Sequence, residues 1–465
     1  MKKIFILLIF VIISYSANSQ IVSPNTYVIS FIDKDTSTYK ITEPEKFLSE
    51  RAINRRQKYN IPVTEQDLPI NKKYINKIKE MGFKIYASSK WMNHVVVNTE
   101  DSTLMDKVAN LDFVKKYEKT KTNKKKKTKK RKLKDIDIDV APDVETVLDY
   151  GYGDNQVEML TLQNLHNKGF MGQGMQIAIL DAGFYRVDTL AGFDSIRTNN
   201  QILGIKDFVK RDSNVYEDAT HGMNVLSTIA ANLPGKLIGT APKANFWLLR
   251  TEDEHSETLV EEYYWLSAAE YADSIGADMI HSSLGYNNFD DKSTSHTYEE
   301  MNGDIAICSI AADIASSKGI LVVTSAGNEG NDPWHYISAP GDADSVLTIG
   351  AVSSSENVSN FSSRGPSKDG RVKPDVMAQG SYVWVLGRRK GVTVSSGTSF
   401  SGPIIAGAVA CLWQANPQFN NMEIIDAVKK SSNRYSNPDD DYGYGIPNFA
   451  KADIYLKKLL KERKE

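Results

Sequence analysis

Residues 396–413 read Ser-Gly-Thr-Ser-Phe-Ser-Gly-Pro-Ile-Ile-Ala-Gly-Ala-Val-Ala-Cys-Leu-Trp, so that a cluster of hydroxyls and small residues runs straight into an apolar segment. This order predicts a buried helix that presents a hydroxyl at its N-terminus, where the helix dipole favours negative charge. Pro403 fits the first turn of such a helix, because a backbone N–H there has no intrahelical partner. Taken alone, the stretch is equally typical of a Ser/Gly loop that caps a core helix.

The N-terminus has the pattern of a secretory signal peptide. Lys2 and Lys3 precede an apolar run at 4–13, and Ala17-Asn18-Ser19 supplies the small residues of a cleavage site. The apolar run is short for a membrane span, so we expect cleavage. The sequence therefore predicts an exported protein, secreted or periplasmic, with no transmembrane anchor after signal cleavage.

The charge of the chain is unevenly distributed. Residues 121–134 contain ten Lys or Arg and no acid, although the formal net charge of the whole chain is −2. Such a segment is typical of an exposed, protease-sensitive connector. Nucleic-acid binding is the alternative, but no aromatic residues interleave the basic ones, and export separates the protein from nucleic acid. We therefore expect no nucleic-acid partner.

Composition shifts and the basic segment divide the chain into four predicted parts. They are a signal peptide at 1–19, a small α+β domain at 20–118, a basic linker with the processing region at 119–146, and a main domain at 147–465. In the main domain, short β-branched runs alternate with helical patterns, which predicts a doubly wound, mostly parallel sheet with helices on both faces. The predicted strands are 175–180, 245–250, 278–284, 320–325 and 346–352.

Four polar residues stand beside glycines at the ends of these elements: Asp181, His221, Asn328 and Ser399. Singly, each has an ordinary structural interpretation, such as a helix cap, a buried histidine or a turn residue. Because sites in such sheets form beyond the carboxyl ends of the strands, we expect the four to converge. Together they supply the functions of acyl transfer: Ser399 attacks, His221 moves the proton, Asp181 orients the imidazole and Asn328 stabilises the oxyanion.

The order Asp, His, Ser and the surrounding motifs resemble those of the subtilisin-like serine proteases. The resemblance covers roughly residues 150–455. The matching segments are Asp181-Ala182-Gly183, His221-Gly222, Gly239-Thr240-Ala241-Pro242, Ser283-Leu284-Gly285, Ala326-Gly327-Asn328, Phe361-Ser362-Ser363-Arg364-Gly365-Pro366, Lys373-Pro374-Asp375, and Gly397-Thr398-Ser399 with Pro403.

This resemblance implies a serine endopeptidase that acts on protein or peptide substrates. It implies substrate-binding roles for Ser283, Leu284, Gly285, Ala326 and Gly327. It also implies that the N-terminal α+β domain is a propeptide, which would act as an intramolecular inhibitor and make the protein a zymogen. Two other functions remain open at this stage, a catalytically inactive subtilisin-like binding module and an esterase. An α/β-hydrolase esterase, however, carries its serine before its acid and its histidine.

Several departures from the family pattern bear on the substrate cleft. Tyr286 stands where a second glycine is common, which should narrow or reshape a subsite, and Phe400 stands where many members have Met. The segment 252–262 is rich in glutamate. It either lines the cleft and favours basic substrate residues, or forms the solvated start of a helix.

We expect no cofactor for the chemistry and predict no catalytic metal. The resemblance implies that structural calcium can be present, and Asp439, Asp440 and Asp441 could contribute to it. A surface turn explains three aspartates equally well, and no EF-hand spacing occurs.

Overall fold

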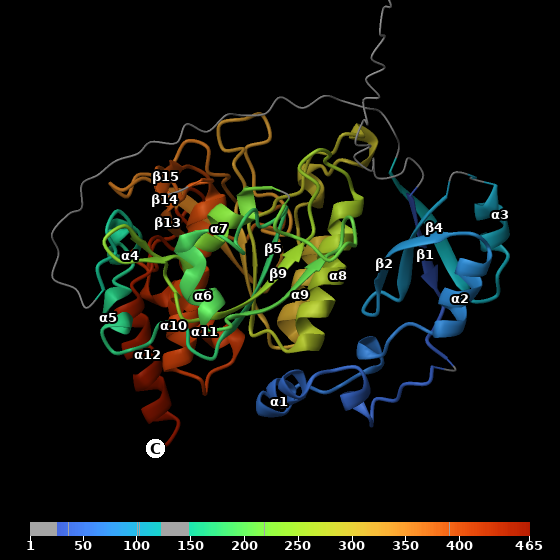
Figure 1. Ribbon diagram of the computed structural model, residues 1–465, viewed down its shortest axis with the longest axis horizontal. Helices are drawn as coiled ribbons and strands as arrows, with labels where there is room; N and C mark the ends of the chain where they lie inside the picture. Colours follow the sequence, from blue (N-terminus) through green and yellow to red (C-terminus); the bar gives the residue numbers. More distant parts are fainter. Residues whose placement is uncertain are drawn as a thin grey trace, which may run out of the picture.

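The computed structural model describes residues 26–121 and 148–465, apart from residues 36, 100, 102, 218 and 390. The predicted signal peptide at 1–19 and most of the predicted linker at 119–146 lie outside the described residues. The described chain forms a smaller N-terminal domain, blue in Figure 1, and a larger domain, coloured from green to red. Within these residues, no helix is long and apolar enough to cross a membrane.

The larger domain is built on seven strands: β5 (Gln176–Asp181), β6 (Ile202–Asp207), β9 (Asn245–Arg250), β10 (Met279–Ser282), β11 (Leu321–Ser325), β12 (Val346–Val352) and β13 (Val376–Gln379). They form one sheet in the order β13-β12-β11-β10-β5-β9-β6, and every neighbouring pair is parallel. The predicted fold class is confirmed. The sequence pattern missed β6 and β13.

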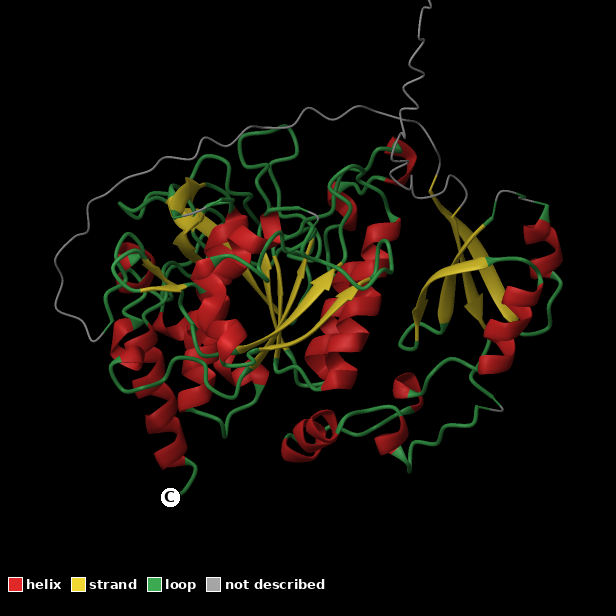
Figure 2. Ribbon diagram, in the orientation of Figure 1, coloured by secondary structure: helices red, strands yellow, loops and turns green. Residues whose placement is uncertain are grey.

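Helices cover both faces of this sheet (Figure 2). They are α4 (Asp154–Glu158), α5 (Gln163–His166), α6 (Asp194–Thr198), α7 (His221–Ala230), α8 (Val260–Ile275), α9 (Ile307–Ser317), α10 (Thr398–Ala415), α11 (Asn421–Ser431) and α12 (Phe449–Glu462). Along β5, Ile177 and Ile179 join the hydrophobic cluster that contains α7 and α10, whereas Ala178 and Leu180 join the cluster that contains α8 and α9. Both sides of the strand are therefore buried, as its unalternated apolar sequence predicts.

Short elements complete the main domain. They are the strand pairs β7 (Asn232–Leu233) with β8 (Leu237–Ile238) and β14 (Val383–Leu386) with β15 (Val392–Ser395), and the 3₁₀ turns Ala191–Phe193, Lys292–Thr294 and Tyr298–Glu300.

The N-terminal domain is an antiparallel sheet covered by helices on one face. Its elements are β1 (Thr26–Phe31), α1 (Glu50–Lys58), α2 (Lys72–Glu80), β2 (Lys84–Ser89), β3 (His94–Asn98), α3 (Leu104–Ala109) and β4 (Val114–Lys121), with 3₁₀ turns at Pro44–Lys46 and Glu65–Asp67. The strand order is β2-β3-β1-β4. β4 continues past the predicted domain boundary at residue 118. The 3₁₀ turn at Pro44–Lys46 precedes α1, and the Ser49 side chain caps the N-terminus of α1.

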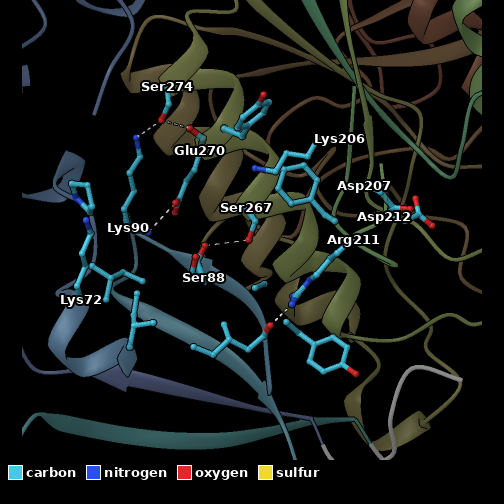
Figure 3. Close-up of a pocket in the computed structure, with 18 residues that line it drawn as sticks. Lys72, Ser88, Lys90, Lys206, Asp207, Arg211, Asp212, Ser267, Glu270 and Ser274 are labelled. Atoms are coloured by element: carbon cyan, nitrogen blue, oxygen red, sulfur yellow. Dashed lines mark hydrogen bonds between the residues drawn. The ribbon is translucent and has the colours of Figure 1, made fainter. Parts of the chain in front are cut away.

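The open face of this sheet packs on α8. Glu270 of α8 accepts hydrogen bonds from the backbone N–H groups of Lys90 and Trp91, at 2.8 and 3.0 Å. The Lys90 ammonium reaches Ser274 at 2.8 Å, and Ser267 donates to the Ser88 carbonyl at 3.2 Å (Figure 3). These contacts border a cavity of about 660 Å³ between the two domains. The N-terminal domain thus contacts α8 through a row of hydrogen bonds as well as through apolar side chains.

A second contact between the domains is an ion cluster that α1 carries to the far end of α8. Arg56 binds both carboxylate oxygens of Asp273 at 2.9 Å and also contacts Asp67 at 3.0 Å. Arg55 binds the same Asp273 carboxylate at 2.7 Å, and all of these side chains are at most 5% exposed. Burial alone would raise the pKa of Asp273, but Lys90 and the two arginines lower it to about 2. The carboxylate therefore stays ionised because the N-terminal domain supplies its cations.

Replacing Arg56 with Met should destabilise the full-length chain by about 3–5 kcal/mol, because Asp273 and Asp67 would lose a buried cation. The measurement is the free energy of unfolding in urea, followed by tryptophan fluorescence, since Trp91 is buried at this interface. Lys46→Met is the matched control, because Lys46 pairs with Glu43 on the exposed surface, and it should leave stability unchanged. A loss below about 1 kcal/mol in Arg56→Met would contradict the argument.

Candidate active site

An aspartate–histidine pair lies at the carboxyl edge of the parallel sheet. Asp181 is the last residue of β5, and His221 is the first residue of α7. His221 Nδ1 lies 2.8 Å from Asp181 Oδ1 and 3.0 Å from Oδ2, and the Ala182 backbone N–H donates to Oδ1 at 2.7 Å. A side chain at Gly222 would place its Cβ 2.4 Å from the Gly183 carbonyl oxygen, so this approach of helix to strand requires glycine.

The electrostatic environment of the pair favours the imidazolium form of His221. Burial alone would lower the pKa of His221, but the charge and hydrogen bond of Asp181, with the charge of Glu252, raise it above its usual value. Asp181 is fully buried, whereas the His221 side chain is 35% exposed. Because Nδ1–H is held by the carboxylate, Nε2 remains the nitrogen that can exchange a proton with a reactant.

Ser399 is the second residue of α10 and is 7% exposed. Its hydroxyl donates to the Ser283 carbonyl at 3.2 Å, and its own carbonyl accepts from the Ser283 hydroxyl at 2.9 Å. Among the described residues its hydroxyl is therefore bonded to Ser283 and not to His221. The His221 ring lies 6.1 Å from that of Phe400, measured between centroids, which places the imidazole beside the first turn of α10.

Pro403 is the sixth residue of α10, so the expectation that it lies in the first turn is wrong. The helix begins earlier, at Thr398, directly after Gly397. Proline cannot donate to the carbonyl four residues before it, which here is that of Ser399. The Ser283 hydroxyl takes the place of the missing N–H. The proline thus frees the Ser399 carbonyl to bind the neighbouring strand segment.

Asn328 lies in an exposed loop that follows β11, and its amide is oriented by the N-terminus of α10. Its Oδ1 accepts from the Thr398 backbone N–H at 2.8 Å and from the Thr398 hydroxyl at 3.1 Å. With Oδ1 so engaged, the Nδ2 group has no partner among the described residues and can donate to a ligand. The backbone of the loop is held by Glu329, which accepts from the Asn328 N–H at 2.7 Å and from the Ser363 hydroxyl at 2.9 Å.

The remaining predicted substrate-binding residues lie on either side of Ser399. Ser283, Leu284 and Gly285 follow β10, and Gly285 is exposed, with no backbone hydrogen bond within the described chain. Ala326 and Gly327 are buried. Gly327 has φ +108°, and a Cβ there would lie 2.5 Å from Glu329, so the turn needs glycine. The backbone of Gly285 is thus available to an extended ligand.

Sequence reasoning missed several residues that support this site. Glu329 and Ser363 brace the Asn328 loop, as described above. His281 is buried, binds the Ser283 hydroxyl at 2.8 Å, and has its pKa lowered by burial to about 3. Ser363 belongs to one of the segments that carry the family resemblance, and nothing in the neighbouring sequence marks Glu329 or His281 as supporting residues. Their function depends on contacts with segments that are distant in sequence.

The glutamate-rich segment 252–262 is not the solvated start of a helix. Glu252, Glu261 and Glu262 are each at most 8% exposed. Tyr286, whose phenol donates to Glu252 Oε2 at 2.8 Å, is itself buried. This hydrogen bond of Tyr286 therefore holds the Glu252 side chain in place.

Two of the three aspartates considered for calcium do not fit such a site. Asp439 pairs with Arg434 at 2.6 Å, and Asp441 pairs with Arg364 at 2.8 Å. Asp439 Oδ1 also accepts backbone N–H groups of the same turn. Carboxylates that are already neutralised by guanidinium groups are poor ligands for a hard cation.

Two known protein families match the two parts of the chain. A model described as the Subtilase family matches residues 172–445, and one described as a Peptidase S8 propeptide domain of Bacteroidota matches residues 26–134. Serine protease AprX of Bacillus subtilis (strain 168) is 29% identical over 307 residues, covering 60% of this chain and 65% of AprX. Subtilisin E of the same organism is 30% identical over 307 residues, covering 65% and 70%.

Two solved structures share the fold. A protease from Pseudoalteromonas arctica has a TM-score of 0.51 at 21% identity, covering 67% of this chain and 100% of its own. The epidermin leader peptide processing serine protease of Staphylococcus aureus has a TM-score of 0.59 at 15% identity, covering 93% and 99%. The chain therefore belongs to the subtilase family of serine proteases, which need no cofactor for catalysis, and it carries a propeptide domain of the Peptidase S8 type.

Proposed function

We propose that this protein is an exported serine endopeptidase, made as a zymogen, that hydrolyses peptide bonds through an acyl-enzyme intermediate on Ser399. The observation that carries the proposal is the Asp181–His221 pair beside the N-terminal turn of α10. The buried carboxylate fixes Nδ1–H of the histidine, as a general base for serine requires. Its substrates would be proteins or peptides, and the protein would be secreted or periplasmic.

The chemistry follows from these positions. The Ser399 hydroxyl turns from Ser283 toward His221, which removes its proton through Nε2 as Oγ attacks the substrate carbonyl carbon. The resulting oxyanion is stabilised by the Asn328 amide and the Ser399 backbone N–H. His221 then gives the proton to the leaving amine as the C–N bond breaks. A water molecule attacks the acyl-enzyme by the same route, which releases the acid and restores the serine.

The substrate backbone would lie along Ser283, Leu284 and Gly285, because the free backbone groups of Gly285 allow an extended peptide to add as a strand. The N-terminal domain would act as an intramolecular inhibitor. Its docking on α8 and its membership of a propeptide family support this role. The basic linker would be the connector that is cut.

Ser399→Ala should lower peptide hydrolysis by several orders of magnitude, because the three catalytic residues act as a unit. The measurement is kcat/KM of the processed enzyme on a chromogenic peptide, with circular dichroism to establish that the variant folds. Ser401→Ala is the matched control, since Ser401 is a buried hydroxyl of the same helix turn that bonds only to Thr398 among the described residues. A fluorophosphonate probe should label the native enzyme at Ser399. A folded, processed sample that takes no label would indicate a binding module instead.

As the pH is lowered, kcat/KM should reach half of its maximum at a pH above 6.5. His221 accepts a proton only when it is neutral, and its raised pKa keeps it protonated to a higher pH than an ordinary histidine. Activity is therefore present above this pKa and is lost as the pH falls through it. Initial rates on an uncharged peptide between pH 5 and 9 provide the profile, and half-loss at pH 6 or below would contradict the assignment.

N-terminal sequencing of the mature protein should place the new N-terminus between Glu118 and Tyr152. The reason is that the linker joins two separately folded domains and is rich in basic residues, which are typical of exposed, cleavable segments. A mature, fully active chain that begins near Gln20 would overturn the zymogen proposal.

A further inference from the structure

A cavity of about 260 Å³ opens beside His221 on the substrate side of the site. Its walls are His221, the segment Ser283–Gly285, and three acidic side chains, Glu252, Glu254 and Glu257. No residue of the Asn328 loop takes part in it. The cavity therefore adjoins the path of the substrate backbone but is separate from the place where the oxyanion would form.

The carboxylate of Glu252 is buried in this wall without a full set of partners. Its Oε2 accepts from the Tyr286 phenol, whereas Oε1 has no hydrogen-bond partner among the described residues, and the side chain is only 8% exposed. Glu257 and Glu261 place carboxylate oxygens within 4.8 Å of that of Glu252. Glu261 is already occupied, because it accepts the backbone N–H groups of Asp253 and Thr258.

No salt bridge among the described residues reaches the carboxylates of Glu252, Glu257 or Glu261. Among these residues, the ion pairs of the segment are Glu254 with His255 and Glu262 with His296. Burial raises the pKa of Glu252 to about 7. Burial and the neighbouring carboxylates raise the pKa of Glu257 and Glu261 well above the usual value. Burying an ionised carboxylate without a cation destabilises the folded protein. A ligand that carries a cation into the cavity would offset this destabilisation.

We propose that this cavity is a substrate subsite that binds a Lys or Arg side chain close to the scissile bond, with Glu252 and Glu257 as its receptors. The inference rests on the proposed endopeptidase function. A metal ion fits less well, because Ca²⁺ requires six to eight oxygen ligands and Glu261 is already occupied. A side-chain cation needs only a few acceptors and matches a cavity open to the cleft. The linker of this chain, with ten basic residues between 121 and 134, has the composition of such a substrate.

The test compares kcat/KM of the processed enzyme on peptide pairs that differ only in Lys against its uncharged isostere norleucine, at each of the four positions on either side of the scissile bond. At one position, the ratio of Lys to norleucine should be about 10 to 100, as expected for a charge-assisted hydrogen bond. Glu252→Gln keeps the side-chain volume and should lower this ratio at least tenfold. Glu257→Gln should lower it by a smaller factor, because Glu257 is partly exposed. Glu356→Gln, an exposed glutamate in a separate loop, is the control and should leave the ratio unchanged.

Each outcome bears on the proposal. A ratio near one at every position in the native enzyme would overturn the subsite while leaving the endopeptidase intact. A high ratio that persists in both glutamine variants would overturn the assignment of the glutamates, and the Glu257 variant provides this test even if Glu252→Gln fails to fold. Loss of calcium-dependent thermal stability in Glu252→Gln, with a native ratio near one, would assign the cluster to a metal ion instead. Failure to cleave any peptide would overturn the proposed function and this inference with it.

Discussion

The parallel alignment of β9, β5, β10 and β11 is the constraint on which the site depends. Because neighbouring parallel strands end at the same edge of a sheet, the residues that follow them converge, although they are far apart in the sequence. Asp181 ends β5, Glu252 follows β9, Ser283 follows β10, and Asn328 follows β11. The sheet thus brings the Asp181 carboxylate, the Glu252 carboxylate, the backbone after Ser282 and the Asn328 amide to the same edge.

The helix α10 brings Ser399, the proposed nucleophile, to that edge and fixes it there. Every residue from Thr398 to Trp413 is buried, so the helix is held by the core along most of its length. At its N-terminus, reciprocal hydrogen bonds join Ser399 to Ser283, and the second turn leaves a carbonyl free for this purpose because Pro403 has no N–H. The proposed nucleophile and the proposed backbone template for the substrate are therefore joined directly, which preserves their relative position.

Much of this arrangement could be predicted from the sequence because its signals are local. The ranges 245–250 and 346–352 match β9 and β12, since buried parallel strands are short continuous apolar runs. The ion cluster of Arg56 and Asp273 could not be predicted, because its members lie 217 residues apart and each is an ordinary charged residue in a helical pattern. The local sequence does not predict the position of Pro403 within α10 for a related reason. The start of α10 is set by contacts of Thr398 with Asn328 at this edge of the sheet, which the local sequence does not contain.

The buried carboxylates of Asp273, Asp181 and Glu252 differ in their hydrogen-bond and ion-pair partners, and these partners indicate the role of each carboxylate. Asp273 is enclosed by two arginines, so its charge is neutralised permanently and it joins two domains. Asp181 is held by one imidazole and one backbone N–H, so its charge acts on a group that gains and loses a proton. The side chain of Glu252 borders an open cavity; one of its oxygens accepts from a phenol, and the other is buried without a partner among the described residues. Because an incompletely paired carboxylate in the interior destabilises the folded state, its neutralising partner is most simply a cation that arrives with a ligand. The same rule of charge burial thus distinguishes a structural acid, a proposed catalytic acid and a proposed recognition acid within one fold.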